Sequence, residues 1–77
     1  MKFQPITTQM DCEMWGCRSG DYSYVISRDL RGEELGYRAS CKGPMDRTPR
    51  HFPENPFPSF GAAEARCRQH SRGRRDA

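Results

Sequence analysis

The sequence predicts a small α+β domain in which an antiparallel sheet of two to three strands packs against one C-terminal α-helix. Three observations indicate this fold: neighbouring segments with alternating side chains, a later segment with helical periodicity, and a length of 77 residues, which suits one domain. An apolar fraction of 34% predicts a thin core, built largely from aromatic side chains. We expect residues 1–71 to form the domain and residues 72–77 to form a flexible basic tail.

The alternating segments predict a β-hairpin over about residues 22–42. Residues 22–28 are rich in aromatic and β-branched side chains, and residues 35–42 alternate apolar with polar ones. The side chains expected on the buried face are Tyr22, Tyr24, Ile26, Leu35, Tyr37, Ala39 and Cys41. Residues 29–34 are expected to form an exposed turn. Residues 2–9 are interpreted as a short edge strand, and residues 11–20, which include Trp15, as a loop or a distorted strand.

Residues 43–58 contain most of the prolines and are predicted to form an irregular loop. Two interpretations of this loop are open. In the first, Phe52 and Phe57 fold back over an edge of the core. In the second, the stiff loop presents these aromatic side chains to a partner, together with Arg47, Arg50 and His51.

The C-terminal helix is predicted over about residues 59–71. Ser59 is a favourable N-cap, and the alanines that follow it have high helix propensity. A single stripe with helical spacing would face the sheet, formed by Phe60, Ala63, Cys67 and His70. Arg66 and Arg68 lie off this stripe and should be solvated, and Gly73 is expected to end the helix.

The net charge of +3 conceals an asymmetry between the two halves of the chain. Residues 1–34 carry four basic and six acidic side chains, whereas residues 35–77 carry nine basic and four acidic ones. Most of the basic side chains are arginines, which favour bidentate contacts to phosphate or carboxylate groups. A bias in base composition explains the same excess, so the charge pattern leaves both explanations open.

Composition and motifs limit the classes of function. No nucleophile–base motif, phosphate-binding glycine loop or HExxH helix occurs in the sequence, so we expect no enzymatic activity. No apolar run approaches the length of a membrane span or of a signal peptide, so we expect a cytoplasmic protein without a membrane partner. In a reducing compartment, free thiols or a metal site are expected in place of disulfides.

We expect no cofactor, and zinc is the alternative that the cysteines leave open. Cys12 and Cys17 enclose a glycine, and Cys67 and His70 lie one helical turn apart. The complete set of candidate ligands is Cys12, Cys17, Cys41, Cys67 and His70. The competing interpretation is that these are structural side chains, because free cysteine is a common small core residue.

Nucleic acid is a candidate partner. A basic helix and tail, with Trp15, Tyr22 and Tyr24 as stacking groups, are the ingredients that such binding requires. Arginines in the tail alone would give weak and salt-sensitive binding. The tyrosines are also expected on the face that the helix covers, which argues against stacking on bases.

The order of these elements resembles a loose group of small phage and prophage proteins of unknown function. The similarity covers about residues 15–70 and rests on Trp15, the strand at residues 22–26, the segment 37–39 and the helix pattern Ser59, Ala63, Cys67 and His70. The chain departs from this group at Ala62, where a capping-box Glu is usual, and at Glu64, where Lys is common.

The resemblance implies that the chain binds a host macromolecule, a protein or ribonucleoprotein complex, and inhibits it, as anti-CRISPR proteins inhibit a defence system. The alternative is a small nucleic-acid-binding or zinc-stabilised regulatory protein. A blocking protein needs an interface with a few aromatic and arginine side chains. The candidate binding residues are Arg47, Arg50, Phe52, Phe57, Arg66, Arg68, Arg72, Arg74 and Arg75.

Overall fold

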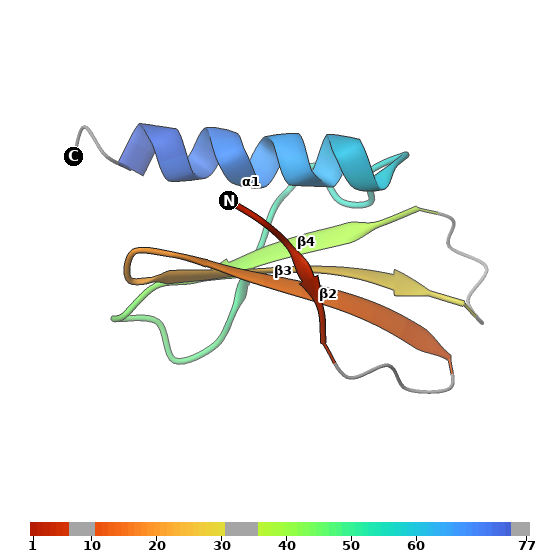
Figure 1. Ribbon diagram of the computed structural model, residues 1–77, viewed down its shortest axis with the longest axis horizontal. Helices are drawn as coiled ribbons and strands as arrows, with labels where there is room; N and C mark the ends of the chain where they lie inside the picture. The colour runs from red at the N-terminus through yellow and green to blue at the C-terminus, as the bar shows by residue number, and fades with distance from the viewer. Residues whose placement is uncertain (7–10, 31–35, 75–77) are drawn as a thin grey trace.

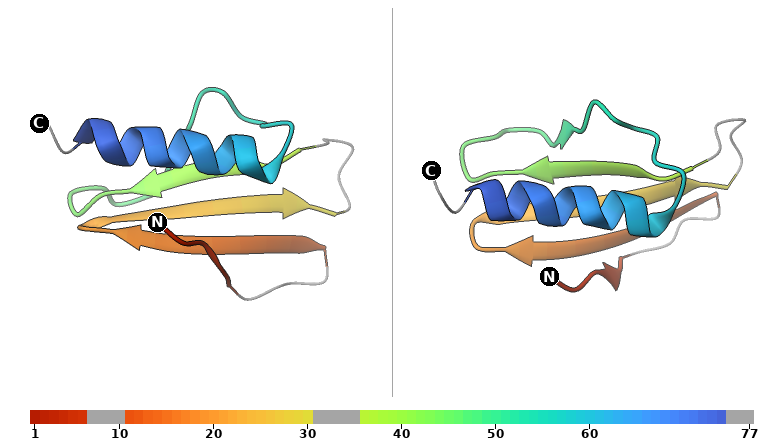
Figure 2. Two further views of the ribbon diagram at one scale, coloured as in Figure 1. Left: turned by 45° about the horizontal axis from the view of Figure 1, so that its top comes forward. Right: turned by 90° about the horizontal axis from the view of Figure 1, so that it is seen from above.

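A computed structural model describes residues 1–6, 11–30 and 36–74 as an antiparallel sheet with one helix lying across it (Figure 1). The strands follow the order β1-β2-β3-β4-β5, and they are β1 (Gln4–Pro5), β2 (Cys12–Ser19), β3 (Tyr22–Asp29), β4 (Arg38–Lys42) and β5 (Arg50–His51). The helix α1 spans Phe60–Arg74 and runs along β3 and β4 (Figure 2). The α+β class is confirmed, but the sheet has five strands, and the predicted two to three is too low.

The strand β2 is the largest departure from the prediction, which allowed only a loop or a distorted strand here. All of its residues pair with β3, from Cys12 opposite Asp29 to Ser19 opposite Tyr22. Gly20 opens the intervening two-residue turn with a φ of 62°, as a type II′ hairpin turn requires. Pairing with β3 overrides the poor strand propensity of residues such as Gly16.

The predicted hairpin of β3 and β4 is confirmed. Tyr24 pairs with Cys41 and Ile26 with Ala39, and all four side chains are buried on the face below the helix. The predicted strand at 35–42 begins later, at Arg38, and Leu35 and most of the predicted turn lie outside the described residues. The predicted edge strand at 2–9 is reduced to Gln4–Pro5, with residues 7–10 outside the description.

The proline-rich segment at 43–58 is tied to β4 along much of its length, so the expectation of an irregular loop is wrong in part. Its β5 residues pair with Ser40 and Cys41. Asn55 then accepts a hydrogen bond from the Ala39 amide at 2.8 Å and donates one to the Ala39 carbonyl at 2.9 Å. The segment follows the sheet edge because an edge strand needs pairing groups on one side only, which tolerates prolines.

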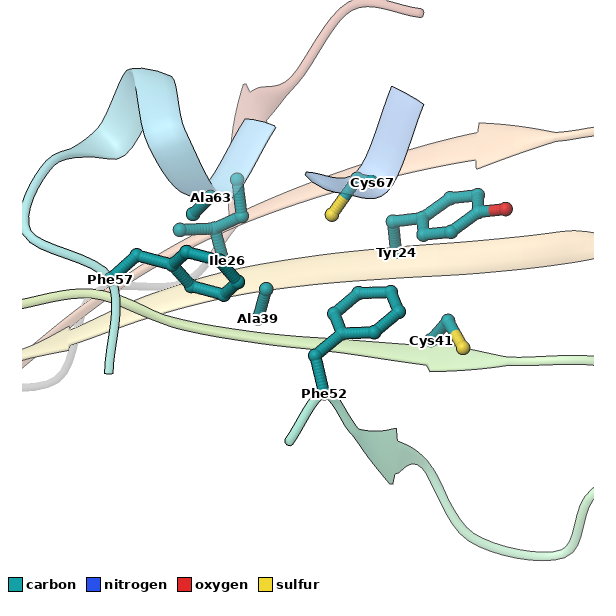
Figure 3. Packing of buried hydrophobic residues seen from close by; sticks show 8 residues of the cluster. All are labelled: Tyr24, Ile26, Ala39, Cys41, Phe52, Phe57, Ala63 and Cys67. Atoms are coloured by element: carbon teal, nitrogen blue, oxygen red, sulfur yellow. The ribbon is translucent and has the colours of Figure 1, made fainter. Parts of the chain in front are cut away.

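The core lies between the helix and the sheet, and Figure 3 shows its eight buried side chains. Ala63 and Cys67 are fully buried, and Phe60 contacts Trp15 and Phe3 edge to face, which confirms the predicted apolar stripe. The buried set is Tyr24, Ile26, Ala39, Cys41, Phe52, Phe57, Ala63 and Cys67.

The two ends of α1 differ in how well the sequence predicts them. Ser59 is the N-cap, as predicted, because its hydroxyl accepts a hydrogen bond from the Ala62 amide at 3.1 Å. The helix continues through Gly73 to Arg74, so Gly73 does not end it. Residues 75–77 of the expected tail are outside the described part. Within that part, the structure has no helix long and apolar enough to cross a membrane.

Candidate functional site

The C-terminus of α1, the β2–β3 turn and the segment after β4 lie at the same end of the molecule (Figure 2), and basic residues occur in or next to each of them. We call this region the basic end and define it as Arg18, Lys42, Arg47, Arg50 and Arg72. All five residues are exposed. These residues come together only through the fold, because they belong to three strands, a connection and a helix.

The uncovered face of the sheet contributes the first part of the basic end. Arg18 on β2 lies opposite Ser23 on β3, and Ser23 lies opposite Lys42 on β4, so the three form one row across the strands. Side chains alternate along a strand, and Tyr24 points to the helix, so this row points to the opposite face. Among the described residues, neither Arg18 nor Lys42 has an ion-pair partner.

The end of α1 is fixed at the same end of the sheet, on the face opposite the row. The hydroxyls of Ser19 and Ser71 lie 2.8 Å apart, which joins the helix to the residue that follows Arg18. Arg72 is the next helical residue and is exposed. A cation in the last turn of a helix also stabilises the negative end of the helix dipole. This explains the position of Arg72 but not those of Arg18 and Lys42.

The segment after β4 contributes Arg47 and Arg50. It turns at once, because the Gly43 amide donates to Asp46 Oδ2 at 2.8 Å. Asp46 also pairs with Arg50 at 3.1 Å, although the Arg50 side chain stays 77% exposed. A hollow of about 220 Å³ lies between this segment and the helix, lined by Tyr22, Cys41, Gly43, Pro44, Met45, Asp46, Arg50 and His70.

The opposite end of the sheet carries acidic side chains. Asp11, Glu13 and Asp29 lie there, and Glu13 forms an ion pair of 3.9 Å with Arg28. The molecule measures 38 × 22 × 22 Å, and its strands and helix run along the long axis (Figure 1). Charges of the opposite sign occur at both ends, with Arg28 and Arg38 near these carboxylates and Asp21 and Asp46 near the basic end. The separation of charge along the molecule is therefore partial, and it favours one orientation of a charged partner during approach.

Phe52 and Phe57 do not belong to this surface. They are 5% and 8% exposed, and each packs into the core from the proline-rich segment (Figure 3). The interpretation that they fold back over the core edge is therefore confirmed. Their predicted role as exposed contacts for a partner is wrong, because so little of either ring reaches the surface.

Arg66 and Arg68 are occupied by contacts within the chain. Arg66 Nε donates to Glu54 Oε2 at 2.8 Å, and its guanidinium lies 4.6 Å from the centre of the Phe52 ring. The hydrogen bond from Arg66 lowers the pKa of Glu54. Arg68 Nη2 donates to the Met1 carbonyl at 3.1 Å and pairs with Glu64 at 3.5 Å. These contacts fasten the helix to neighbouring segments.

Arg74 and Arg75 complete the predicted set of binding residues. The main chain of Arg74 belongs to the last turn of α1, and Arg75 is outside the described residues.

The structure separates Cys12 from the other candidate metal ligands. Cys12 points to the uncovered face, because Trp15, three positions along β2, packs against the helix residue Phe60. Cys17 and Cys41 flank Tyr24 on the covered face. Nowhere in ranges 1–6, 11–30 and 36–74 do three His, Cys, Asp or Glu side chains form a group that could hold a metal ion.

Cys67 and His70 have structural surroundings instead. Burial raises the pKa of the Cys67 thiol to about 12, with a further contribution from the nearby Cys41. The thiol is therefore protonated at neutral pH in the metal-free protein. His70 Nδ1 shares a hydrogen bond of 2.9 Å with the Tyr24 hydroxyl.

The sequence prediction missed Arg18 and Lys42. Lys42 occupies an outward position of a strand that was predicted correctly, so its exposure could be read from the alternation. Arg18 lies in β2, which was not recognised as a regular strand. The row that joins them depends on the register of three strands.

Comparison of this chain with models of protein families, with curated proteins and with solved structures finds no significant match.

Proposed function

We propose that this protein is a non-enzymatic binding protein that attaches to a host macromolecular complex through its basic end and blocks that complex. The observation that carries the proposal is the gathering of Arg18, Lys42, Arg47 and Arg72 at one end of the molecule, without an ion-pair partner among the described residues. Like charges placed side by side repel one another, so this arrangement is explained by a partner that neutralises them.

The resemblance to small phage and prophage proteins supports the choice of partner. Small phage proteins often bind a host macromolecule and block it, and the proposed target is a defence complex, as for anti-CRISPR proteins. The separation of charge along the molecule favours approach with the basic end first.

A phage-protection assay tests this function. The chain is expressed in a panel of bacterial strains, each with one active CRISPR system, and the strains are challenged with a phage that the system targets. We expect the chain to restore plaques in at least one strain and to copurify with the defence complex of that strain.

A triple variant, Arg18→Glu with Lys42→Glu and Arg72→Glu, should lose both effects. The control is Arg28→Glu at the acidic end, which should keep them, because Arg28 is also exposed and its side chain pairs locally with Glu13. Unchanged immunity in every strain, or equal protection by the triple variant, would contradict the proposal.

A further inference from the structure

The row formed by Arg18, Ser23 and Lys42 lies on the one face of the sheet that no helix covers in the described part of the chain. Neighbouring strands lie about 4.8 Å apart, so the two basic residues are separated by roughly 10 Å across the sheet. The serine between them is a hydrogen-bond donor. Contacts of Lys, Arg and Ser side chains to phosphate oxygens are the commonest way in which proteins hold nucleic-acid backbones.

We propose that this row binds the phosphate backbone of a double-stranded nucleic acid, with Arg47 and Arg72 contributing from around the end of the sheet, since α1 lies on the other face. The inference rests on the proposed function and deepens it, because it names the component of the host complex that the basic end contacts. The spacing of Arg18 and Lys42 is close to the roughly 12 Å width of the major groove of B-DNA, so their side chains reach phosphates on its two sides.

The positions of the aromatic rings favour backbone contacts over stacking on unpaired bases. Trp15 packs against Phe60 with ring centres 5.0 Å apart, and Tyr24 is fully buried. Tyr22 stacks on Tyr24, and Gly43 lies so close to its ring that an added Cβ would come within 2.8 Å of it. The rings that would serve single-stranded binding are thus used within the fold.

An acidic protein is the competing partner for a basic surface. Protein interfaces concentrate their binding energy in apolar or aromatic anchors. Among the described residues next to the basic end, the large apolar side chain that is exposed is Met45, at 92%. A phosphate backbone offers nothing for Met45 to bury against. Substitution of Met45 therefore distinguishes a protein partner, whose binding it should weaken, from a nucleic acid, whose binding it should not change.

The test is fluorescence anisotropy of the full-length purified chain with a labelled duplex DNA, a single strand of the same sequence, and labelled polyglutamate. We expect the duplex to bind most tightly, with affinity falling about 100-fold between 50 and 200 mM salt if four phosphates are contacted. Arg18→Gln and Lys42→Gln should each reduce the salt slope by about 1. Arg28→Gln and Met45→Ser should leave binding unchanged.

Each variant keeps Arg74 and Arg75, so a difference between variants reports the row on the sheet and not the C-terminus. Circular dichroism of each variant serves as the control that the exposed substitutions leave the fold intact. Three results would overturn the inference: polyglutamate binding as tightly as DNA, a loss of binding in Met45→Ser, or binding unaffected by both row variants. If the chain blocks a defence system without binding DNA, the inference fails and the proposed function stands. If DNA binds and no system is blocked, the proposed function fails and the inference stands.

Discussion

The hydroxyl oxygen of Tyr24 lies 2.9 Å from Nδ1 of His70, which joins the middle of the sheet to the C-terminal half of the helix. The His70 ring also contacts Tyr22 and Phe52, with ring centres 5.5 and 5.7 Å away. These contacts hold the last turns of α1 over the sheet. They therefore set the position of Arg72 relative to Arg18.

Tyr24→Phe should lower the free energy of unfolding by about 1 kcal/mol, because it removes a hydrogen bond whose donor and acceptor lie between helix and sheet. Tyr37→Phe is the matched control, since the Tyr37 hydroxyl accepts only a long, exposed hydrogen bond of 3.4 Å from Arg28. Its effect should stay below about 0.5 kcal/mol. Denaturant unfolding measures both, and equal effects would contradict the assigned role of the Tyr24–His70 pair.

Gly36→Ala should destabilise the fold by more than about 1 kcal/mol. Gly36 has a φ of 122°, and a Cβ at this position would come within 2.5 Å of the Phe57 carbonyl oxygen.

Gly73→Ala should instead stabilise the fold by up to about 1 kcal/mol, because Gly73 lies within α1 with open space around it. A loss of stability in Gly73→Ala, seen by thermal unfolding, would mean that the helix does not continue through this residue.

The cysteines should differ in reactivity. Cys12 and Cys17 are partly exposed, whereas Cys41 and Cys67 are buried. Iodoacetamide at pH 8 should modify Cys12 and Cys17 first, and Cys67 should react at the rate of unfolding, because burial raises the pKa of its thiol to about 12. Mass spectrometry of peptides follows each site. Rapid labelling of Cys67 in the folded protein would show that the core is open there.

The same thiol makes stability depend on alkaline pH. The pKa of Cys67 is raised by folding from an ordinary value of 9.0, so its contribution is fully present below about pH 9 and is lost as pH rises toward 12. Cys67→Ala should flatten the decline of unfolding free energy between pH 9 and 11, at a cost in packing at all pH values. An unchanged decline would contradict the assignment.

Glu54 should titrate below its ordinary pKa of 4.5, because Arg66 donates a hydrogen bond to its carboxylate. The stabilising contact is then present above the unfolded pKa and is lost as pH falls through the lowered value. In Arg66→Gln, the pKa of Glu54 should return toward its ordinary value, which an NMR titration of the side-chain carboxyl measures. Lys42→Gln is the control, and equal pKa values in all three proteins would refute the contact.

Much of the fold could be predicted from periodicity. The alternation at β3 and β4 and the stripe of Phe60, Ala63 and Cys67 identify buried faces directly, because burial imposes the period of each element. The strand β2 lacked this signal, since its residues are neither clearly alternating nor β-branched. It is a strand because β3 pairs with its whole length.

The candidate site was less predictable for a physical reason. The sequence identifies a cationic side chain but not the groups around it. The arginines of the helix and of the proline-rich segment are therefore all predicted as binding residues. In the fold, Arg66 is held by Glu54 and is not available to a partner. Lys42, which the sequence prediction omits, lies in a row with Arg18 because of the register of three strands. The candidate metal ligands are divided in the same way, because Cys12 and Cys17 point to opposite faces of β2.

The most direct test of the account is a map of the surface that a polyanion contacts. An ¹⁵N-labelled sample is titrated with a duplex DNA, and amide shifts are followed by NMR at low salt. The largest shifts should fall at Arg18, Ser23, Lys42, Arg47 and Arg72 and should fade as salt is added. Shifts concentrated at the acidic end, around Glu13 and Asp29, or spread evenly over the chain would contradict the claim that the basic end is the working surface.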